Sequence, residues 1–240
     1  MVKIIAHRGF SGRFPENTII AFQKAIELGV EEIEFDIKIS KDEKLILLHD
    51  KTVDRTTNGK GKISEMDSKD IKELDAGSWF NPEYKGTQIP TFEKVLKNIP
   101  EAIELNIHAL PDSRVTEQII FYLNKYKRVK SAYIAIDANQ VPLARKLCPE
   151  IRLCNMHRQT SPNKYIEETK RLNCPILQFF TPAYEVTENL IKKAHNYYLF
   201  VNVFYADKKE EIEKLIRLGA DAILTNYPDL LLQVRGETKK

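Results

Sequence analysis

Short apolar runs alternate with longer amphipathic stretches along most of the chain, a pattern typical of repeated βα units. The apolar runs predict strands near residues 3–7, 31–38, 45–49, 102–108, 132–136, 151–154, 175–179, 198–204 and 221–225. The amphipathic stretches predict helices near residues 16–28, 91–98, 113–127, 138–147, 163–172, 187–196, 207–218 and 227–234. Gly29 and Gly219 each follow a predicted helix directly, where a glycine commonly ends the helix.

This alternation predicts an α/β fold, the (β/α)8 or TIM barrel, with the 45–49 stretch paired beside the second strand. Because barrels of this class commonly reach such a length undivided, the 240 residues are expected to form one domain, 1–240. The active site of such a barrel lies at the carboxyl ends of its strands. Two helix starts are predicted from capping residues, Asn17 before the first helix and Asp207, with Glu210 at the third helical position, before a later one.

Residues 51–88 depart from the pattern, because Gly, Asp, Ser, Thr and Lys replace the apolar periodicity. Such a long connection is usually a functional excursion over the surface, so we expect a small insertion here. Trp79, Phe80 and Tyr84 lie in the insertion and are expected to form a small core of its own. The alternative is that they line the binding site.

The composition narrows the class of protein. The 37 basic and 34 acidic residues leave a net charge of +3, without the concentrated basic face of a nucleic-acid-binding protein. No apolar run approaches the roughly 20 residues of a membrane span, and no signal pattern precedes the first strand. Cys148, Cys154 and Cys174 lack metal-type spacing and are expected to be buried thiols in a reducing compartment. These features predict a cytoplasmic protein. The sequence leaves the oligomeric state open, since it has no exposed heptad or obvious self-complementary stretch.

Chemically reactive residues gather at the predicted strand ends of the first fifty residues. His7 and Arg8 end the first strand, and His49 follows the third. Glu34 and Asp36 are two apart on the second strand, so their side chains face the same way. Paired carboxylates suit a divalent cation, arginine suits a bidentate phosphate contact, and either histidine can act as acid or base. The set indicates metal-assisted phosphate chemistry.

These residues belong to five short motifs: His7-Arg8-Gly9, Pro15-Glu16-Asn17-Thr18, Glu34-x-Asp36, His49-Asp50 and Arg55-Thr56-Thr57. In order and spacing the motifs resemble those of the glycerophosphodiester phosphodiesterase family. The resemblance continues through residues 89–92 to the segment 219–228, and so covers nearly the whole chain.

The resemblance implies a metal-dependent enzyme of glycerol and lipid metabolism that releases sn-glycerol 3-phosphate and an alcohol. It implies a TIM barrel, a divalent ion that is often Mg²⁺ or Ca²⁺, and attack by the substrate's own hydroxyl before water opens a cyclic phosphate. His7 and His49 match the family's catalytic histidines, and Glu34 and Asp36 match its first two metal ligands. Arg8 is the expected phosphate contact.

The third metal ligand departs from the family pattern Leu-Asn-Ile-Glu-Ile-Lys-Pro. Residues 105–111 read Leu-Asn-Ile-His-Ala-Leu-Pro, so His108 replaces the glutamate and Leu110 replaces the lysine. A shifted register would supply Glu104 instead. Glu104 and His108 share one face of the strand, but His108 lies nearer its carboxyl end and is therefore the preferred third metal ligand. An imidazole ligand makes Mn²⁺ or Zn²⁺ possible, because it is a poorer ligand for Mg²⁺ and Ca²⁺.

Two later motifs also differ from the family, since Asn226 stands in place of an aspartate and Phe204-Tyr205 in place of Trp-Thr. Other polar residues at later strand ends are weaker candidates for the pocket or its rim: Gln178, Asn202, Tyr205, His157 and Arg158.

The leading hypothesis is hydrolysis of a small-molecule glycerophosphodiester with His7 and His49 as acid and base. The departures leave two alternatives. One is a catalytically impaired barrel that still binds a phosphorylated small molecule, and the other is a phosphodiesterase with an altered substrate, such as a lysophospholipid. A broad exposed apolar patch around 51–88 would favour the lipid.

Overall fold

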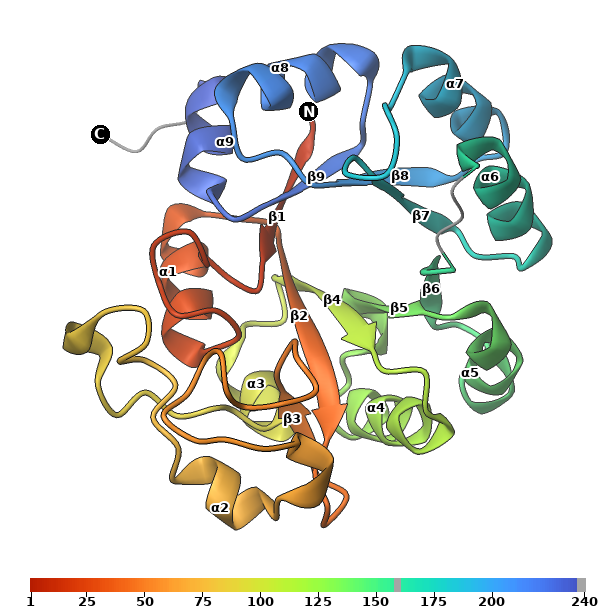
Figure 1. Ribbon diagram of the computed structural model, residues 1–240. Coiled ribbons are helices and arrows are strands. Elements are labelled where there is room, and N and C mark those ends of the chain that lie inside the picture. The colour runs from red at the N-terminus through yellow and green to blue at the C-terminus, as the bar shows by residue number, and fades with distance from the viewer. Residues whose placement is uncertain (158–160, 237–240) are drawn as a thin grey trace.

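A computed structural model describes residues 1–157 and 161–236 and contains a closed parallel barrel (Figure 1). Each strand pairs with its neighbour in parallel, and β1 pairs with both β2 and β9, which closes the sheet. The predicted TIM barrel is confirmed. Its strands are β1 (Lys3–His7), β2 (Glu32–Ile39), β4 (Glu104–Ala109), β5 (Ala132–Ile136), β6 (Arg152–Asn155), β7 (Ile176–Phe180), β8 (Phe200–Phe204) and β9 (Ala222–Thr225).

Helices surround the strands, and their apolar faces pack against the outside of the barrel (Figure 1). Gly29 and Gly219 end α1 and α8 in the left-handed region, with φ of 94° and 89°, as predicted. The helices are α1 (Ile19–Leu28), α3 (Phe92–Asn98), α4 (Ser113–Lys125), α5 (Val141–Leu147), α6 (Pro162–Arg171), α7 (Glu188–Asn196), α8 (Lys209–Leu218) and α9 (Pro228–Arg235). Short 3-10 turns, η3 (Val129–Ser131) and η4 (Ala138–Gln140), precede β5 and α5.

Both predicted capping residues have other roles. The N-cap of α1 is Thr18, whose side chain accepts from the Ala21 backbone, whereas Asn17 binds the buried Asp36. The N-cap of α8 is Lys208, which makes no side-chain cap. The carboxylate of Asp207 turns instead toward the end of β9. The capping predictions are therefore wrong, because both side chains find partners on neighbouring strands.

The insertion follows β3 (Leu45–Leu47), which pairs antiparallel with β2. It contains η1 (Ile63–Glu65), α2 (Ser68–Lys72) and η2 (Pro82–Tyr84), and lies beside α1 in Figure 1. Its buried core is aliphatic, formed by Val53, Ile63, Ile71 and Ala76 with neighbours from β3. Trp79 is 38% exposed, so the prediction of an aromatic core is wrong.

The aromatic residues of the insertion instead form a partly exposed row that reaches the loop after β1. The rings of Trp79 and Phe80 lie 5.6 Å apart, those of Phe80 and Tyr84 6.0 Å, and those of Tyr84 and Phe14 5.8 Å. Trp79 Nε1 donates to the Ala76 carbonyl, so its polar group is satisfied at the surface.

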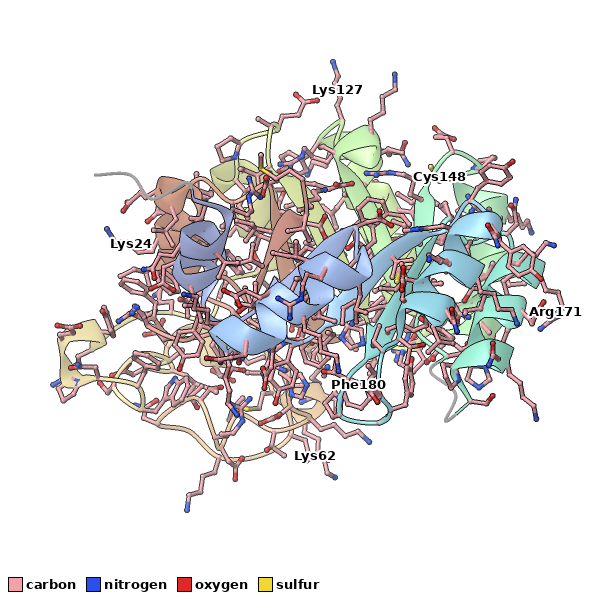
Figure 2. The ribbon with its side chains drawn as sticks, turned by 90° about the horizontal axis from the view of Figure 1, so that it is seen from above. Lys24, Lys62, Lys127, Cys148, Arg171 and Phe180 are labelled. Atoms are coloured by element: carbon pink, nitrogen blue, oxygen red, sulfur yellow. The ribbon has the colours of Figure 1, made fainter. Side chains whose placement is uncertain are left out.

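The two ends of the barrel carry different parts of the chain (Figure 2). Phe180, the last residue of β7, and Lys62, in the insertion, lie at one end in this view, whereas Lys127 and Cys148 lie at the other. The insertion therefore shares the carboxyl-end face, where barrel active sites lie. Among the helices of the described residues, none has the length and apolar character needed to cross a membrane.

Candidate active site

A pocket at the carboxyl ends of the strands is lined by all six predicted site residues: His7, Arg8, Glu34, Asp36, His49 and His108. They come from β1 and the residue directly after it, from β2 and β4, and from the segment after β3. Four further residues of the lining are Asn106, Met156, Gln178 and Phe204. Residues separated by more than a hundred positions in the sequence thus meet at one face of the barrel.

Three side chains form a group that could hold a metal ion. The strand register places Glu34 beside Asn106 and Asp36 beside His108, on inward faces of β2 and β4. One ligand atom each from Glu34, Asp36 and His108 lies within 4.8 Å of the others. His108 Nδ1 is 3.1 Å from Asp36 Oδ1 and 4.0 Å from Glu34 Oε1. Two carboxylates and an imidazole form a donor set that fits a divalent cation.

Asn106 supports this fit. Its side chain is fully buried and lines the same pocket, yet neither its amide nitrogen nor its amide oxygen has a hydrogen-bond partner among the described residues. A buried amide without partners is costly, unless a bound group supplies them. The pocket therefore offers a carbonyl oxygen beside the two carboxylates.

The alternative ligand Glu104 lies elsewhere. The register pairs it with Glu32, two residues before Glu34 and toward the amino end of the barrel. Its carboxylate forms ion pairs with Lys3 and Arg152. The structure places His108, and not Glu104, beside the paired carboxylates.

Asp36 is the electrostatic centre of the group. Burial alone would raise its pKa, but a hydrogen bond and the charge of His108, together with the charge of Arg8, hold the pKa of Asp36 well below its usual range. Asn17 Nδ2 donates to Asp36 Oδ2 at 3.0 Å. Asp36 is therefore ionised at neutral pH, as a metal ligand must be.

Arg8 follows β1 with φ of 56°, and this left-handed turn directs its backbone and side chain to different carboxylates. Its backbone N–H donates to Glu34 Oε2 at 3.1 Å. Its guanidinium lies between Glu16, at 2.8 Å from Nη1, and Asp36, at 3.1 Å from Nε. Burial lowers the pKa of Arg8, but Asp36 and Glu16 more than compensate. The guanidinium is thus a fixed cation in the pocket wall.

His7 is buried, and its ring lies 4.7 Å from that of Phe204. Its Nδ1 is 2.7 Å from the side-chain oxygen of Asn226, and its Nε2 is 3.8 Å from Glu34 Oε2. Burial and the nearby charge of Arg8 lower the pKa of His7 to about 4. The ring is therefore neutral at neutral pH.

His49 reaches the pocket by a reversal of the chain. Because β3 runs antiparallel to β2, the chain returns toward Asp36, and the Leu48 backbone N–H donates to the Asp36 carbonyl at 3.2 Å. His49 Nδ1 is 2.7 Å from Asp50 Oδ1, and Arg55 Nε donates to Asp50 Oδ2 at 2.6 Å. The hydrogen bonds from Arg55 and His49 outweigh the effect of burial and lower the pKa of Asp50.

The other polar residues that the sequence suggested for the pocket or its rim lie in different places. Gln178 lines the pocket, whereas Asn202 donates to the Tyr133 hydroxyl within the barrel. Tyr205 is 38% exposed and lines a separate groove near α8. His157 binds Glu168 at 2.9 Å on the surface, and Arg158 lies outside the described residues.

Sequence reasoning missed Asp207 and Ser11, which both contact Asn226. The Asp-Lys-Lys-Glu pattern at Asp207 fits a helix cap equally well, so it gave no signal of a site role. Ser11 lies four residues after His7, and no pattern sets it apart from an ordinary loop serine.

Paired carboxylates, an arginine and three histidines at the carboxyl-end face of a TIM barrel define a barrel enzyme whose site suits phosphate esters. The sequence model of the glycerophosphoryl diester phosphodiesterase family matches residues 7–230, and the chain belongs to this family. The expectation of an enzyme of this family is thereby confirmed.

Relatives match over nearly the full length. A glycerophosphodiester phosphodiesterase of Bacillus altitudinis is 30% identical and covers 100% of both chains. One from Caldanaerobacter subterraneus subsp. tengcongensis is 29% identical and covers 96% of each.

Solved structures agree with the fold. A phosphodiesterase of Oleispira antarctica, in complex with the product sn-glycerol-3-phosphate, matches with a TM-score of 0.89 and 25% identity, over 98% of this chain and 96% of that one. A glycerophosphodiester phosphodiesterase of Agrobacterium tumefaciens matches with a TM-score of 0.86 and 26% identity, over 97% and 100%.

Proposed function

We propose that this protein hydrolyses glycerophosphodiesters to sn-glycerol 3-phosphate and an alcohol, in a metal-dependent reaction with His7 and His49 as base and acid. The observation that carries the proposal is the meeting of both histidines, Arg8 and the Glu34–Asp36–His108 group in one pocket. The names of the full-length relatives support the reaction class.

Glu34, Asp36 and His108 would hold the divalent ion. When bound, such an ion neutralises phosphate charge and lowers the pKa of an oxygen that it contacts. The family resemblance favours Mg²⁺ or Ca²⁺, whereas the imidazole of His108 favours Mn²⁺ or Zn²⁺.

The surroundings of the two histidines suggest their roles. His7 is neutral, and its Nε2 lies on the Glu34 side of the ring, so it can accept the proton of an attacking hydroxyl. His49 has the Asp50 carboxylate at Nδ1, which stabilises an imidazolium that can protonate the leaving alcohol. Arg8 would orient the phosphate from the pocket wall.

The surface of the insertion favours a small soluble diester over a lysophospholipid. Among the exposed large hydrophobic side chains of the described residues, only Trp79 lies within 51–88. Phe80 and Tyr84 are only partly exposed beside it, and the exposed Ser78, Asn81 and Glu83 interrupt this row, so it does not form the broad apolar patch that would favour a lipid. Leu110 is partly buried against the core, and its apolar side chain does not supply the charge of the family's lysine.

The deciding experiment is release of sn-glycerol 3-phosphate from a panel of glycerophosphodiesters. Metal-stripped protein would receive Mg²⁺, Ca²⁺, Mn²⁺ or Zn²⁺, with His49→Ala as the control variant. We expect metal-dependent turnover that the variant loses. Binding of glycerol phosphate by calorimetry, without turnover for any ion, would instead support the catalytically impaired barrel.

We also propose the cytoplasm as the compartment. Cys148, Cys154 and Cys174 are all buried and form no disulfide, which suits a reducing environment.

A further inference from the structure

Three side chains in a row connect the ends of three strands behind His7. His7 ends β1, Asn226 follows β9, and Asp207 lies between β8 and α8. Asn226 Oδ1 is 2.7 Å from His7 Nδ1, and Asn226 Nδ2 donates to Asp207 Oδ2 at 2.6 Å. We propose that Asn226 and Asp207 are positioning residues that fix the tautomer of His7, with the proton on Nδ1 and the lone pair on Nε2.

The direction of the Asn226 amide follows from Asp207. Asp207 Oδ1 accepts from the Asn226 backbone N–H and from Thr225 Oγ1, each at 2.9 Å, and these bonds fix the carboxylate. Because a carboxylate can only accept, Asn226 must turn its NH₂ group toward Asp207 and its oxygen toward His7. Ser11 Oγ lies 2.7 Å from that oxygen and 2.7 Å from the His7 carbonyl oxygen, and its single proton can go to either acceptor, so the direction of the amide is set by Asp207.

The tautomer of His7 follows from the direction of the amide. An amide oxygen can only accept, so the Nδ1 of His7 carries the proton and donates it. Nε2 is then left with the lone pair that a base needs. Asp207 thus acts on His7 through Asn226, whose amide oxygen is the contact of Nδ1. This inference rests on the base role of His7 proposed above, but the tautomer itself can be measured independently of activity.

The Asp207→Asn variant tests whether Asp207 sets the orientation of the Asn226 amide, and through it the tautomer of His7. The new amide must still accept from the Asn226 backbone and Thr225, so it would place an NH₂ group against the NH₂ of Asn226. Two donors cannot bond, and Asn226 would flip and present its NH₂ to Nδ1 of His7. The proton would then move to Nε2, and we expect kcat to fall about a hundredfold or more with little change in KM.

The Asn226→Asp variant should also lose kcat, but for a different reason. It would place two carboxylates in the 2.6 Å contact that Asn226 and Asp207 now share, and like charges at this distance repel. The double variant Asp207→Asn/Asn226→Asp restores a donor facing an acceptor and an acceptor facing Nδ1. We expect it to recover most of the kcat that either single variant loses.

Two further measurements complete the test. The first is ¹⁵N NMR of the histidine rings in metal-stripped protein, assigned with a His7→Gln variant, which should show Nδ1–H in the native chain and Nε2–H in Asp207→Asn. The second is activity of the matched control Asp221→Asn. Asp221 binds His195 and the Val201 backbone beside the start of β9, at the opposite end of the barrel, so its kcat should not change.

The outcomes separate the inference from the proposed function. If the native chain cleaves no diester, the proposed function fails, and the NMR measurement alone decides the inference. An Nδ1–H tautomer that persists in Asp207→Asn would overturn the inference. A double variant that folds but recovers no kcat above the single variants, in an active native enzyme, would also overturn it.

Discussion

The two proposed acid–base histidines of the pocket, His7 and His49, lie in opposite surroundings. His7 is 8% exposed and faces the neutral amide of Asn226, and burial and the charge of Arg8 lower its pKa to about 4. The side chain of His49 is 42% exposed and lies 2.7 Å from the carboxylate of Asp50. One side of the pocket mouth therefore favours a neutral imidazole, and the other places a carboxylate against the imidazole ring.

This difference shows that the surroundings of each ring, namely its burial, the nearby charges and the partner at Nδ1, set what each histidine can do. An amide accepts the Nδ1 proton without adding charge, whereas a carboxylate also stabilises the imidazolium. A base that starts neutral and an acid that starts protonated are what diester cleavage requires. Variants on each side of the pocket mouth can test whether His7 and His49 have these separate roles.

The largest expected effect comes from replacing each histidine in turn. His7→Ala should lower kcat about a thousandfold on any diester, because the attacking hydroxyl loses its base. His49→Ala should lower kcat by a similar factor on the glycerophosphodiester of choline. On the corresponding nitrophenyl phosphodiester, whose leaving group needs no proton, the same variant should lower kcat less than about tenfold.

Steady-state kinetics on the two substrates measures this difference. Equal losses for both variants on the nitrophenyl ester would contradict the assignment of base and acid, and a larger loss for His49→Ala would reverse it.

A smaller effect is expected from the partner of His49. Asp50→Asn removes the charge that stabilises the imidazolium, so kcat on the choline diester should fall about tenfold or somewhat more. Asp54→Asn is the matched control, since Asp54 is exposed and its carboxylate accepts only from the Gly61 backbone among the described residues. Kinetics of both variants with saturating metal would measure the effect, and an equal loss in the two would argue against a role for the Asp50 charge.

The neutral state of His7 also predicts a pH dependence of folding. The folded pKa of about 4 lies below the unfolded value of 6.5, so the unfolded chain binds more protons between these values. The free energy of unfolding should therefore fall as pH drops from 6.5 to about 4, by at most about 3 kcal/mol from this residue.

Urea unfolding of metal-free protein and of His7→Gln, measured across this pH range, isolates the contribution. The variant should show a shallower fall in stability as pH decreases. Parallel curves for the two proteins would mean that His7 is not held neutral by the fold.

The sequence predicted the barrel and the pocket because both depend on strong local patterns. Apolar runs mark the buried strands, and the period of two along β2 and β4 brings Glu34, Asp36 and His108 to one face. The same period explains why His108, and not Glu104, joins the group, since a shift of four residues moves a side chain toward the other end of the barrel.

Contacts between distant loops could not be predicted in this way. Asp207 fits a helix cap by its sequence, but its carboxylate binds Thr225 and Asn226, and this choice depends on where β9 ends. Trp79 fits a core residue by its type, but the aliphatic side chains of the insertion already fill the space. Local propensity is overridden where a neighbouring element offers a better partner.

The smallest predicted effect concerns phosphate charge on the His49 side of the mouth. Lys38 follows Asp36 by two residues on the same face of β2, and burial lowers its pKa although the charge of Asp36 opposes this. Leu110, directly after β4, carries no charge, and we expect Lys38 to supply the cation that the family's lysine would provide. Lys38→Met should raise KM about tenfold with kcat nearly unchanged. The exposed Lys44 gives the matched control Lys44→Met, and an equal KM for the two variants would place the phosphate contact on the His7 side, at Arg8 alone.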